Sequence, residues 1–127
     1  MISDFFLVLV TKHVRKQLKF YKDLLQLELL FDNKDTIGVG KNGRLFIVLR
    51  EDDTEESHHL TTQKGPQIIT FKCEGNIEHY RCAVTQAGFK VRDELILPEH
   101  KIQYLFVEDY DGNEICLDFS PNQYNLC

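Results

Sequence analysis

The feature that most constrains the fold is a plan of predicted elements that occurs twice in the 127 residues. In each half, a strand-like apolar segment is followed by a segment with helical periodicity and then by three more strand-like segments. The predicted segments are 5–10, 14–25, 27–31, 36–40 and 44–50 in the first half, and 67–73, 76–88, 89–97, 102–108 and 114–119 in the second half. A duplicated unit of this kind can curl its sheets around a cleft. We therefore predict an α+β fold in which two βαβββ modules, with curled mixed sheets, form a shared cleft.

The first half shows how the elements are inferred. "FFLVLV" at 5–10 is apolar on both faces, which predicts a buried strand. Val14, Leu18, Tyr21 and Leu25 recur at helical spacing, with lysines between them. The glycines of "TIGVG" at 36–40 are expected to weaken that strand, and Asn-Gly at 42–43 predicts a tight turn.

The length favours one domain over 1–127, with module 1 at about 1–51, a linker at about 52–66 and module 2 at about 67–120. The linker is rich in carboxylates and poor in large apolar residues, which is typical of an exposed connection. It contains His58 and His59, which could attract a transition metal together with these carboxylates. Adjacent side chains of an extended segment point apart, so we favour a solvated loop.

Charge, the length of the apolar segment and the cysteine content bear on the partners and the location of the protein. The net charge of −5 and the pI near 5.5 argue against nucleic acid and against an anionic membrane surface as partners. The apolar segment 5–10 is too short for a signal peptide or a membrane helix. There are four cysteines and no Cys-x-x-Cys pair, so a reducing cytoplasm and small, buried, unreactive thiols are expected. The cysteines are Cys73, Cys82, Cys116 and Cys127.

The stretch "DYDGN" at 109–113 could belong to a calcium loop or to a turn. A calcium loop needs glycine at its sixth position and a bidentate glutamate at its twelfth. Counting from Asp109, Gly112 is fourth and Ser120 is twelfth. The stretch therefore predicts a tight turn between the last two strands.

Two motifs carry a resemblance that spans nearly the whole chain. "FYKDLLQLEL" at 20–29 is similar to the Phe-Tyr-x-Asp-x-Leu-Gly-Leu helix end of the vicinal oxygen chelate superfamily, and "DYDGNEICL" at 109–117 is similar to its Asp-Pro-Asp-Gly-Asn-x-Ile-Glu-Leu motif. This superfamily includes glyoxalases, extradiol dioxygenases and bleomycin-resistance proteins. Gln26 stands where the family usually has glycine, and Tyr110 where it usually has proline.

Enzymes of this superfamily hold a divalent ion with His and Glu from the first and last strands of each half. The resemblance places these ligand positions at Phe6, Val48, Gln67 or Ile68, and Cys116. A shift of one residue still yields no His or Glu: the alternatives are Phe5 or Leu7, Ile47 or Leu49, Pro66 or Ile69, and Ile115 or Leu117. We therefore expect no metal site and no cofactor, and a metal-free cleft similar to that of bleomycin-resistance proteins.

By alternation along the strands, the resemblance places an apolar surface with a few charges in the cleft. The predicted cleft residues are Phe6, Val8, Phe46, Val48, Arg50, Glu114 and Cys116. Such a cleft would suit an aromatic or amphipathic small molecule with an ionic group, bound by a homodimer. Two alternatives stay open. One is a metal-dependent lyase, isomerase or dioxygenase using displaced ligands, which would be Glu99, His100, Glu114 or Cys116. The other is an interaction module in which these faces only pack a closed core or an interface.

Overall fold

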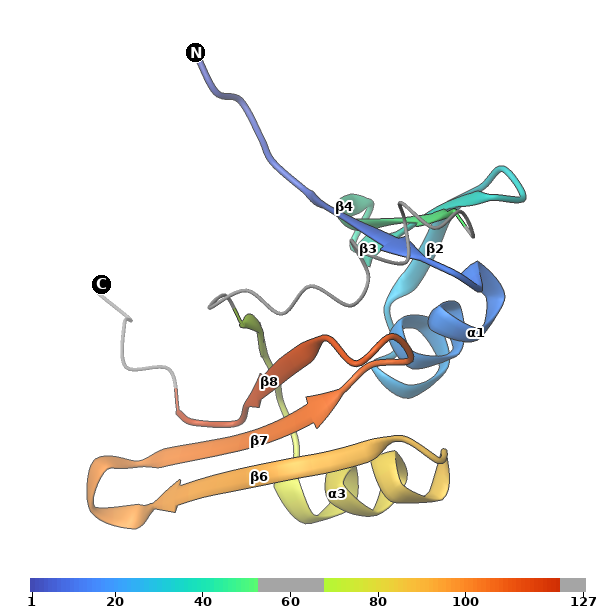
Figure 1. The fold of residues 1–127 in the computed structure, drawn as a ribbon. Helices are drawn as coiled ribbons and strands as arrows, with labels where there is room; N and C mark the ends of the chain where they lie inside the picture. Colours follow the sequence, from blue (N-terminus) through green and yellow to red (C-terminus); the bar gives the residue numbers. More distant parts are fainter. Residues whose placement is uncertain (53–67, 122–127) are drawn as a thin grey trace. The chain divides into compact units, whose positions relative to one another are not determined.

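The computed structural model describes residues 1–52 and 68–121. The predicted linker from residue 53 onward, with His58 and His59, and also Gln67 and Cys127, lie outside these residues. The chain forms two compact units, residues 1–64 and 65–127. Each unit contains one four-stranded mixed sheet, which confirms the two predicted βαβββ modules (Figure 1). That the units share one domain and one cleft stays a prediction.

The first unit contains the sheet β1-β4-β3-β2, in which β1 runs parallel to β4 and the other pairs are antiparallel. Between β1 and β2 lies a short helix, α1, which continues directly into a π-helical turn, η1 (Figure 1). The elements are β1 (Leu7–Thr11), α1 (Val14–Leu18), η1 (Lys19–Leu24), β2 (Glu28–Asp32), β3 (Thr36–Lys41) and β4 (Arg44–Glu51). The helical crossover lets β2 run in the same direction as β1, and the two antiparallel connections that follow make β4 parallel to β1 as well.

One face of this sheet forms the core of the first unit with α1 and η1. Ile47 and Leu49 alternate on this face of β4 and are almost completely buried. Their partners on β3 and the helical residues facing them are equally buried: Ile37, Val39, Val14, Phe20 and Tyr21. Glu51, next on the same face, accepts a hydrogen bond from the Val14 amide at 3.0 Å. Its carboxylate thereby satisfies one free N–H at the start of α1.

The second unit contains the sheet β5-β8-β7-β6, with β5 parallel to β8 and the other pairs antiparallel. Its elements are β5 (Ile69–Lys72), α3 (Ile77–Gln86), β6 (Lys90–Leu97), η2 (Pro98–His100), β7 (Ile102–Glu108) and β8 (Glu114–Asp118). Asn76 caps α3 by accepting a hydrogen bond from the Glu78 amide at 2.7 Å. This cap confirms the predicted helix start near Asn76.

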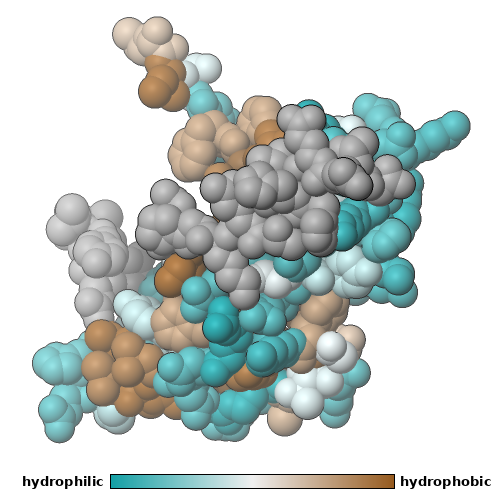
Figure 2. Space-filling model, viewed as in Figure 1, coloured by the Kyte–Doolittle hydropathy of each residue, from teal (hydrophilic) through white to brown (hydrophobic). Residues whose placement is uncertain are grey.

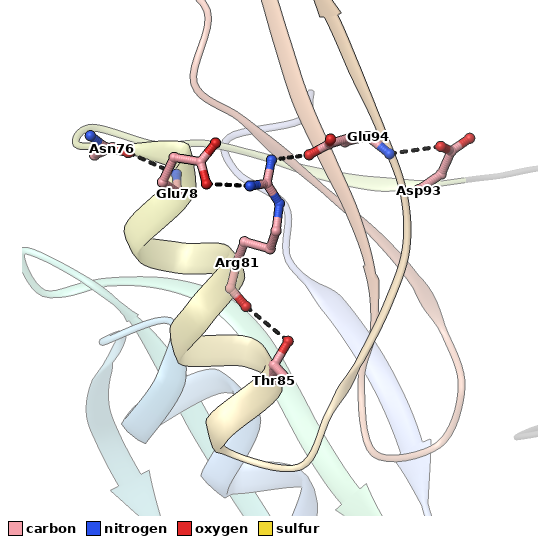
Figure 3. A network of polar contacts seen from close by, with 6 residues as sticks. All are labelled: Asn76, Glu78, Arg81, Thr85, Asp93 and Glu94. Carbon is pink, nitrogen blue, oxygen red and sulfur yellow. Dashed lines mark hydrogen bonds and ion pairs between the residues drawn. The ribbon is translucent and has the colours of Figure 1, made fainter.

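Helix α3 covers one face of the second sheet. Four side chains on that face of β7 and β8 are fully buried: Leu105, Val107, Ile115 and Leu117. At one end, the ring of Tyr80 packs against Phe119 with centroids 5.1 Å apart. Arg81 of α3 forms ion pairs with Glu78 of the same helix and with Glu94 of β6 (Figure 3). The four buried side chains and the ion pair between Arg81 and Glu94 show which face of the sheet the helix covers.

The predicted turn at 109–113 is confirmed. The buried Asp109 carboxylate accepts hydrogen bonds from the amides of Asp111 and Asn113, at 3.0 and 2.9 Å, and from Asn113 Nδ2 at 2.8 Å. Gly112 has a φ of 83°, which glycine adopts without steric cost. The acid and amide groups of this motif therefore shape the connection between β7 and β8.

Left-handed backbone also occurs where the sequence predicts turns. Asn42 and Gly43 have φ values of 54° and 76°, as the predicted hairpin turn requires. Gln26, at the family's glycine position, has a φ of 63°. The backbone is therefore left-handed at this position although the residue is not glycine, and the Cβ atom of Gln26 makes this conformation sterically unfavourable.

The prediction that segment 5–10 is a buried strand is wrong. The strand begins at Leu7, and Phe6 and Val8 are 50% and 51% exposed. Strand β1 lies at the edge of its sheet with β4 as its hydrogen-bonded neighbour, so an apolar sequence on both faces did not imply burial here. Figure 2 shows this apolar N-terminal surface at the top, and a second apolar patch over the end of the β6–β7 hairpin, where Leu95 to Leu97 are exposed. Within residues 1–52 and 68–121, no helix has the length and apolar character needed to cross a membrane.

Candidate functional site

The predicted site residues of the first unit lie on the face of its sheet opposite α1. Val8 and Val48 are directly paired across β1 and β4, and Val10 and Arg50 are the next pair on the same face. Phe46 lies two residues before Val48 and is half-buried. Val48 is 9% exposed, whereas Arg50 is exposed. The structure thus brings Val8, Val48 and Arg50 onto one surface, and Phe6 precedes β1. Phe46 lies at a bulge of β4, between the Val39–Ile47 and Gly40–Leu45 pairs, where strict alternation ends.

Phe31 is a residue of this face that the sequence analysis missed. Gly38 of β3 pairs with Val48 on one side and with Phe31 of β2 on the other. A Cβ atom at Gly38 would lie 2.2 Å from the nearest Phe31 ring carbon, so the ring lies directly over the glycine. The glycine therefore makes room for an aromatic ring beside Val48. Glycine was expected to weaken this strand, and its spacing along the chain gives no sign of the ring on the neighbouring strand.

The predicted residues of the second unit, Glu114 and Cys116, lie on the face of its sheet opposite α3. Across β8 and β7, Glu114 pairs with Glu108 and Cys116 pairs with Phe106. Tyr104 pairs with Asp118 in the next row. We call these six residues the β7–β8 face: Tyr104, Phe106, Glu108, Glu114, Cys116 and Asp118. All except the buried Cys116 are half-buried.

Two of the three carboxylates of the β7–β8 face have a cationic neighbour. Arg92 Nη1 of β6 lies 3.4 Å from Glu108 Oε1, and Lys72 Nζ of β5 lies 3.5 Å from Asp118 Oδ2. Lys72 also donates a hydrogen bond to the Ser120 carbonyl. The cations thus come from the two outer strands and the carboxylates from the two central strands.

Cys116 is 5% exposed, and its chemistry is set by burial. Burial raises the pKa of its thiol, the negative charge of Asp118 adds to this effect, and a hydrogen bond with Thr70 opposes it. The thiol is therefore neutral at neutral pH and is a poor nucleophile. This agrees with the predicted role of Cys116 as a small buried residue, whereas the expectation of burial is wrong for Cys82, which is exposed.

The side chains at the family's metal positions do not fit a divalent ion. Phe6, Val48 and Ile68 offer no donor atom, and Cys116 offers a buried neutral thiol. The alternative third position, Gln67, lies outside the described residues. Over residues 1–52 and 68–121, no three His, Cys, Asp or Glu side chains form a group that could hold a metal.

The displaced ligands considered from the sequence do not come together. Glu99 and His100 are exposed and lie in η2, just before β7 begins at Ile102. Glu114 pairs with Glu108, at the far end of the seven-residue strand β7. The two ends of such a strand are about 20 Å apart. A displaced metal site that combines His100 with Glu114 is therefore excluded, because the register of β7 and β8 separates these residues.

The alternation of apolar and polar residues along β7 indicates two further residues of this face. "IQYLFVE" at 102–108 places Tyr104, Phe106 and Glu108 on one face and Leu105 and Val107 on the other. The tight turn at 109–113 would also have indicated that Glu108 and Glu114 pair. Phe106 and Tyr104 were therefore detectable as neighbours of Cys116.

The two βαβββ modules are the fold expected of the superfamily that the two sequence motifs resemble. The sequence model described as "Glyoxalase/Bleomycin resistance protein/Dioxygenase superfamily" matches residues 5–117. The chain belongs to this superfamily, which confirms the resemblance inferred from its two motifs. No curated protein matches the chain.

Solved structures share the fold at low sequence identity. The fosfomycin resistance protein FosX from Listeria monocytogenes is 16% identical, with 96% of this chain and 97% of that chain covered and a TM-score of 0.77. FosX from Mesorhizobium loti is 10% identical, with full coverage of both chains and a TM-score of 0.74. An integron cassette protein from the mobile metagenome of Halifax Harbour Sewage Outfall is 21% identical, with 93% and 99% coverage and a TM-score of 0.67. At these identities the likeness extends to the fold alone.

Proposed function

We propose that this chain is a small-molecule-binding protein that uses the faces of its two sheets opposite the helices and no divalent metal. The observation that carries the proposal is the composition of these faces. Each combines apolar or aromatic side chains with a few charges, and lies opposite the face that packs the helix. Mostly apolar surfaces with a few placed polar groups are typical of small-molecule sites.

The residue types at the family's ligand positions support a binding role over the family's metal-dependent reactions. A structure of the Listeria FosX protein contains Mn(II) and 1S,2S-dihydroxypropylphosphonic acid. In the present chain, Phe6, Val48 and Cys116 stand at three of the positions from which the superfamily's enzymes hold their ion. We infer no reaction for this chain, and binding resembles the role of the superfamily's bleomycin-resistance proteins.

A thermal-shift screen of neutral, cationic and anionic aromatic compounds tests the proposal. We expect at least one class to raise Tm, because a ligand that binds the folded state stabilises it. Phe106→Leu should reduce this rise, whereas Phe89→Leu, which lies outside the β7–β8 face, should leave it unchanged. A screen in which no compound stabilises the protein would refute the binding role.

Metal analysis separates binding from the enzymatic alternative. Protein purified without chelator should contain no stoichiometric divalent ion, because the side chains at the ligand positions cannot hold one. One bound ion per chain that is lost on Glu114→Ala or His100→Ala would instead support a metal-dependent enzyme.

Two further parts of the proposal concern assembly and location. We propose a homodimer, supported by the exposed apolar residues of β1 and of the β6–β7 hairpin. Sedimentation equilibrium should give twice the chain mass. We also propose a cytoplasmic location, supported by Cys73, Cys82 and Cys116, which are free thiols. Fractionation of cells should recover the protein with cytoplasmic markers.

A further inference from the structure

Two carboxylates stand directly opposite each other on the β7–β8 face. Glu108 and Glu114 are partners across the antiparallel strands β7 and β8. Side chains at such positions have Cβ atoms about 5 Å apart, and like charges placed there are destabilising. The turn at 109–113 fixes this register, so the two acids cannot move apart by a strand slip.

The surrounding cations compensate only one member of this pair. Arg92 lies 3.4 Å from Glu108. The Glu114 carboxylate makes no ion pair or hydrogen bond with residues 1–52 or 68–121. Lys72, the cation nearest along β5, is directed to Asp118 and to the Ser120 carbonyl. Glu114 is thus a half-buried negative charge for which this part of the fold supplies no counter-charge.

One aromatic ring lies diagonal to this uncompensated charge, and a second lies one row further along the same face. Phe106 pairs with Cys116, the neighbour of Glu114 on the same face of β8, so it lies diagonal to the carboxylate. Tyr104 follows on the same face of β7, with its ring centroid 6.2 Å from that of Phe106. The faces of aromatic rings attract cations, and their apolar carbon surface packs against an organic body. A carboxylate and two rings within one patch therefore favour the same kind of ligand.

We propose that the ligand of the β7–β8 face is an organic cation, with its ammonium group at Glu114 and its apolar part against Phe106 and Tyr104. This inference rests on the proposed binding function and adds the charge of the ligand. The cation would neutralise the carboxylate that Arg92 leaves uncompensated.

Charge complementarity favours this occupant over the others. On β6, Lys90 pairs with Glu108 and Asp93 pairs with Phe106, so the face with its two outer strands carries four carboxylates and three cations. The ion pairs of Lys72 and Arg92 are with Asp118 and Glu108, and neither is with Glu114. An anionic ligand would meet Glu114 without a free partner. A second copy of the chain that docked by the same face would bring the same excess of negative charge against it.

Three compounds of similar size and different charge test the proposal: 2-phenylethylammonium, 2-phenylethanol and phenylacetate. Titration calorimetry at neutral pH should show that the cation binds at least tenfold more tightly than the alcohol, and that phenylacetate binds most weakly. Glu114→Gln should remove this preference, and Glu114→Asp should retain part of it. The matched control Glu99→Gln, in the exposed turn η2, should change neither.

The free protein provides a second measurement. If Glu114 opposes Glu108 without compensation, Glu114→Gln should raise Tm in the absence of ligand by about 1–4 °C. A lower Tm would mean that the carboxylate has a structural partner, and would overturn the proposal. Equal binding of the cation and the alcohol would overturn the charge preference and leave the binding function intact. If none of the screened compounds binds, the binding function itself fails. Self-association that Glu114→Gln abolishes, with no effect of the cation, would identify a second copy as the occupant.

Discussion

The contact between Phe31 and Gly38 leads to a prediction that can be worked out in detail. Replacing Gly38 by alanine would place a methyl carbon 2.2, 2.6 and 2.8 Å from three atoms of the Phe31 ring. Carbon atoms in contact prefer a separation of about 3.5–4.0 Å. The ring must therefore retreat by more than an ångström from its position on the sheet.

The expected cost of Gly38→Ala follows from two opposing effects. Overpacking of this kind costs about 1–3 kcal/mol. Replacing glycine also restricts the unfolded chain, which stabilises the folded state by about 0.4–1 kcal/mol. We expect the variant to lose about 1–2 kcal/mol of unfolding free energy, measured by urea titration with circular dichroism.

A double-mutant cycle tests whether the ring is the cause. In a Phe31→Ala background the obstacle is absent, so Gly38→Ala should be neutral or stabilising by up to about 1 kcal/mol. Gly40→Ala provides the matched comparison, because its Cβ would lie 1.8 Å from the Arg44 carbonyl oxygen, a backbone atom. Truncating Phe31 should not rescue that variant. If Gly38→Ala costs the same in both backgrounds, the ring does not lie over Gly38 and the description of this face is wrong.

Three further predictions concern single residues. Gln26 is exposed and left-handed at φ 63°, so Gln26→Gly should stabilise the protein by about 0.5–1 kcal/mol in urea titration, whereas Gln26→Ala should not. The buried Asp109 carboxylate accepts three hydrogen bonds, so Asp109→Ala should cost about 2–4 kcal/mol in the same assay. Burial raises the pKa of the Cys73 thiol to about 11, above the value of about 8.5 that it has in the unfolded chain. The stability that this pKa difference gives the folded state is therefore complete below pH 8.5 and is lost as the pH rises toward 11. After allowance for partial solvent screening, the unfolding free energy should fall by about 1–2 kcal/mol over this pH range. The fall should be smaller in Cys73→Ala. An equal fall in both proteins would exclude the thiol as its cause.

Most of the secondary structure could be predicted from the sequence because its signals are local. The spacing of Val14 and Leu18 predicted the helix, and Asn42-Gly43 predicted a turn that has the left-handed φ values expected of it. The π-helical geometry of η1 was not predicted. It arises within the same apolar pattern, and the spacing of Tyr21 and Leu25 does not distinguish it from an α-helix.

The candidate site could be predicted only in part, for a similar reason. Alternation correctly placed Val48 with Arg50, and Glu114 with Cys116, because a strand of fixed period needs no tertiary information. The pairing of Phe31 with Gly38 and of Phe106 with Cys116 depends on register between strands. Register cannot be determined from one sequence, so the positions of both aromatic rings were not predicted.

By itself, the sequence determined the duplicated plan and the turns, and the resemblance assigned residues to the family's metal positions, which stays a prediction. These properties reside in single residues and in their spacing along the chain. The tertiary structure decided that β1 is an edge strand with exposed apolar residues, that His100 and Glu114 lie at opposite ends of β7, and that Glu108 faces Glu114. Each of these depends on which strand lies beside which and in what register, and that is settled when distant segments pack together.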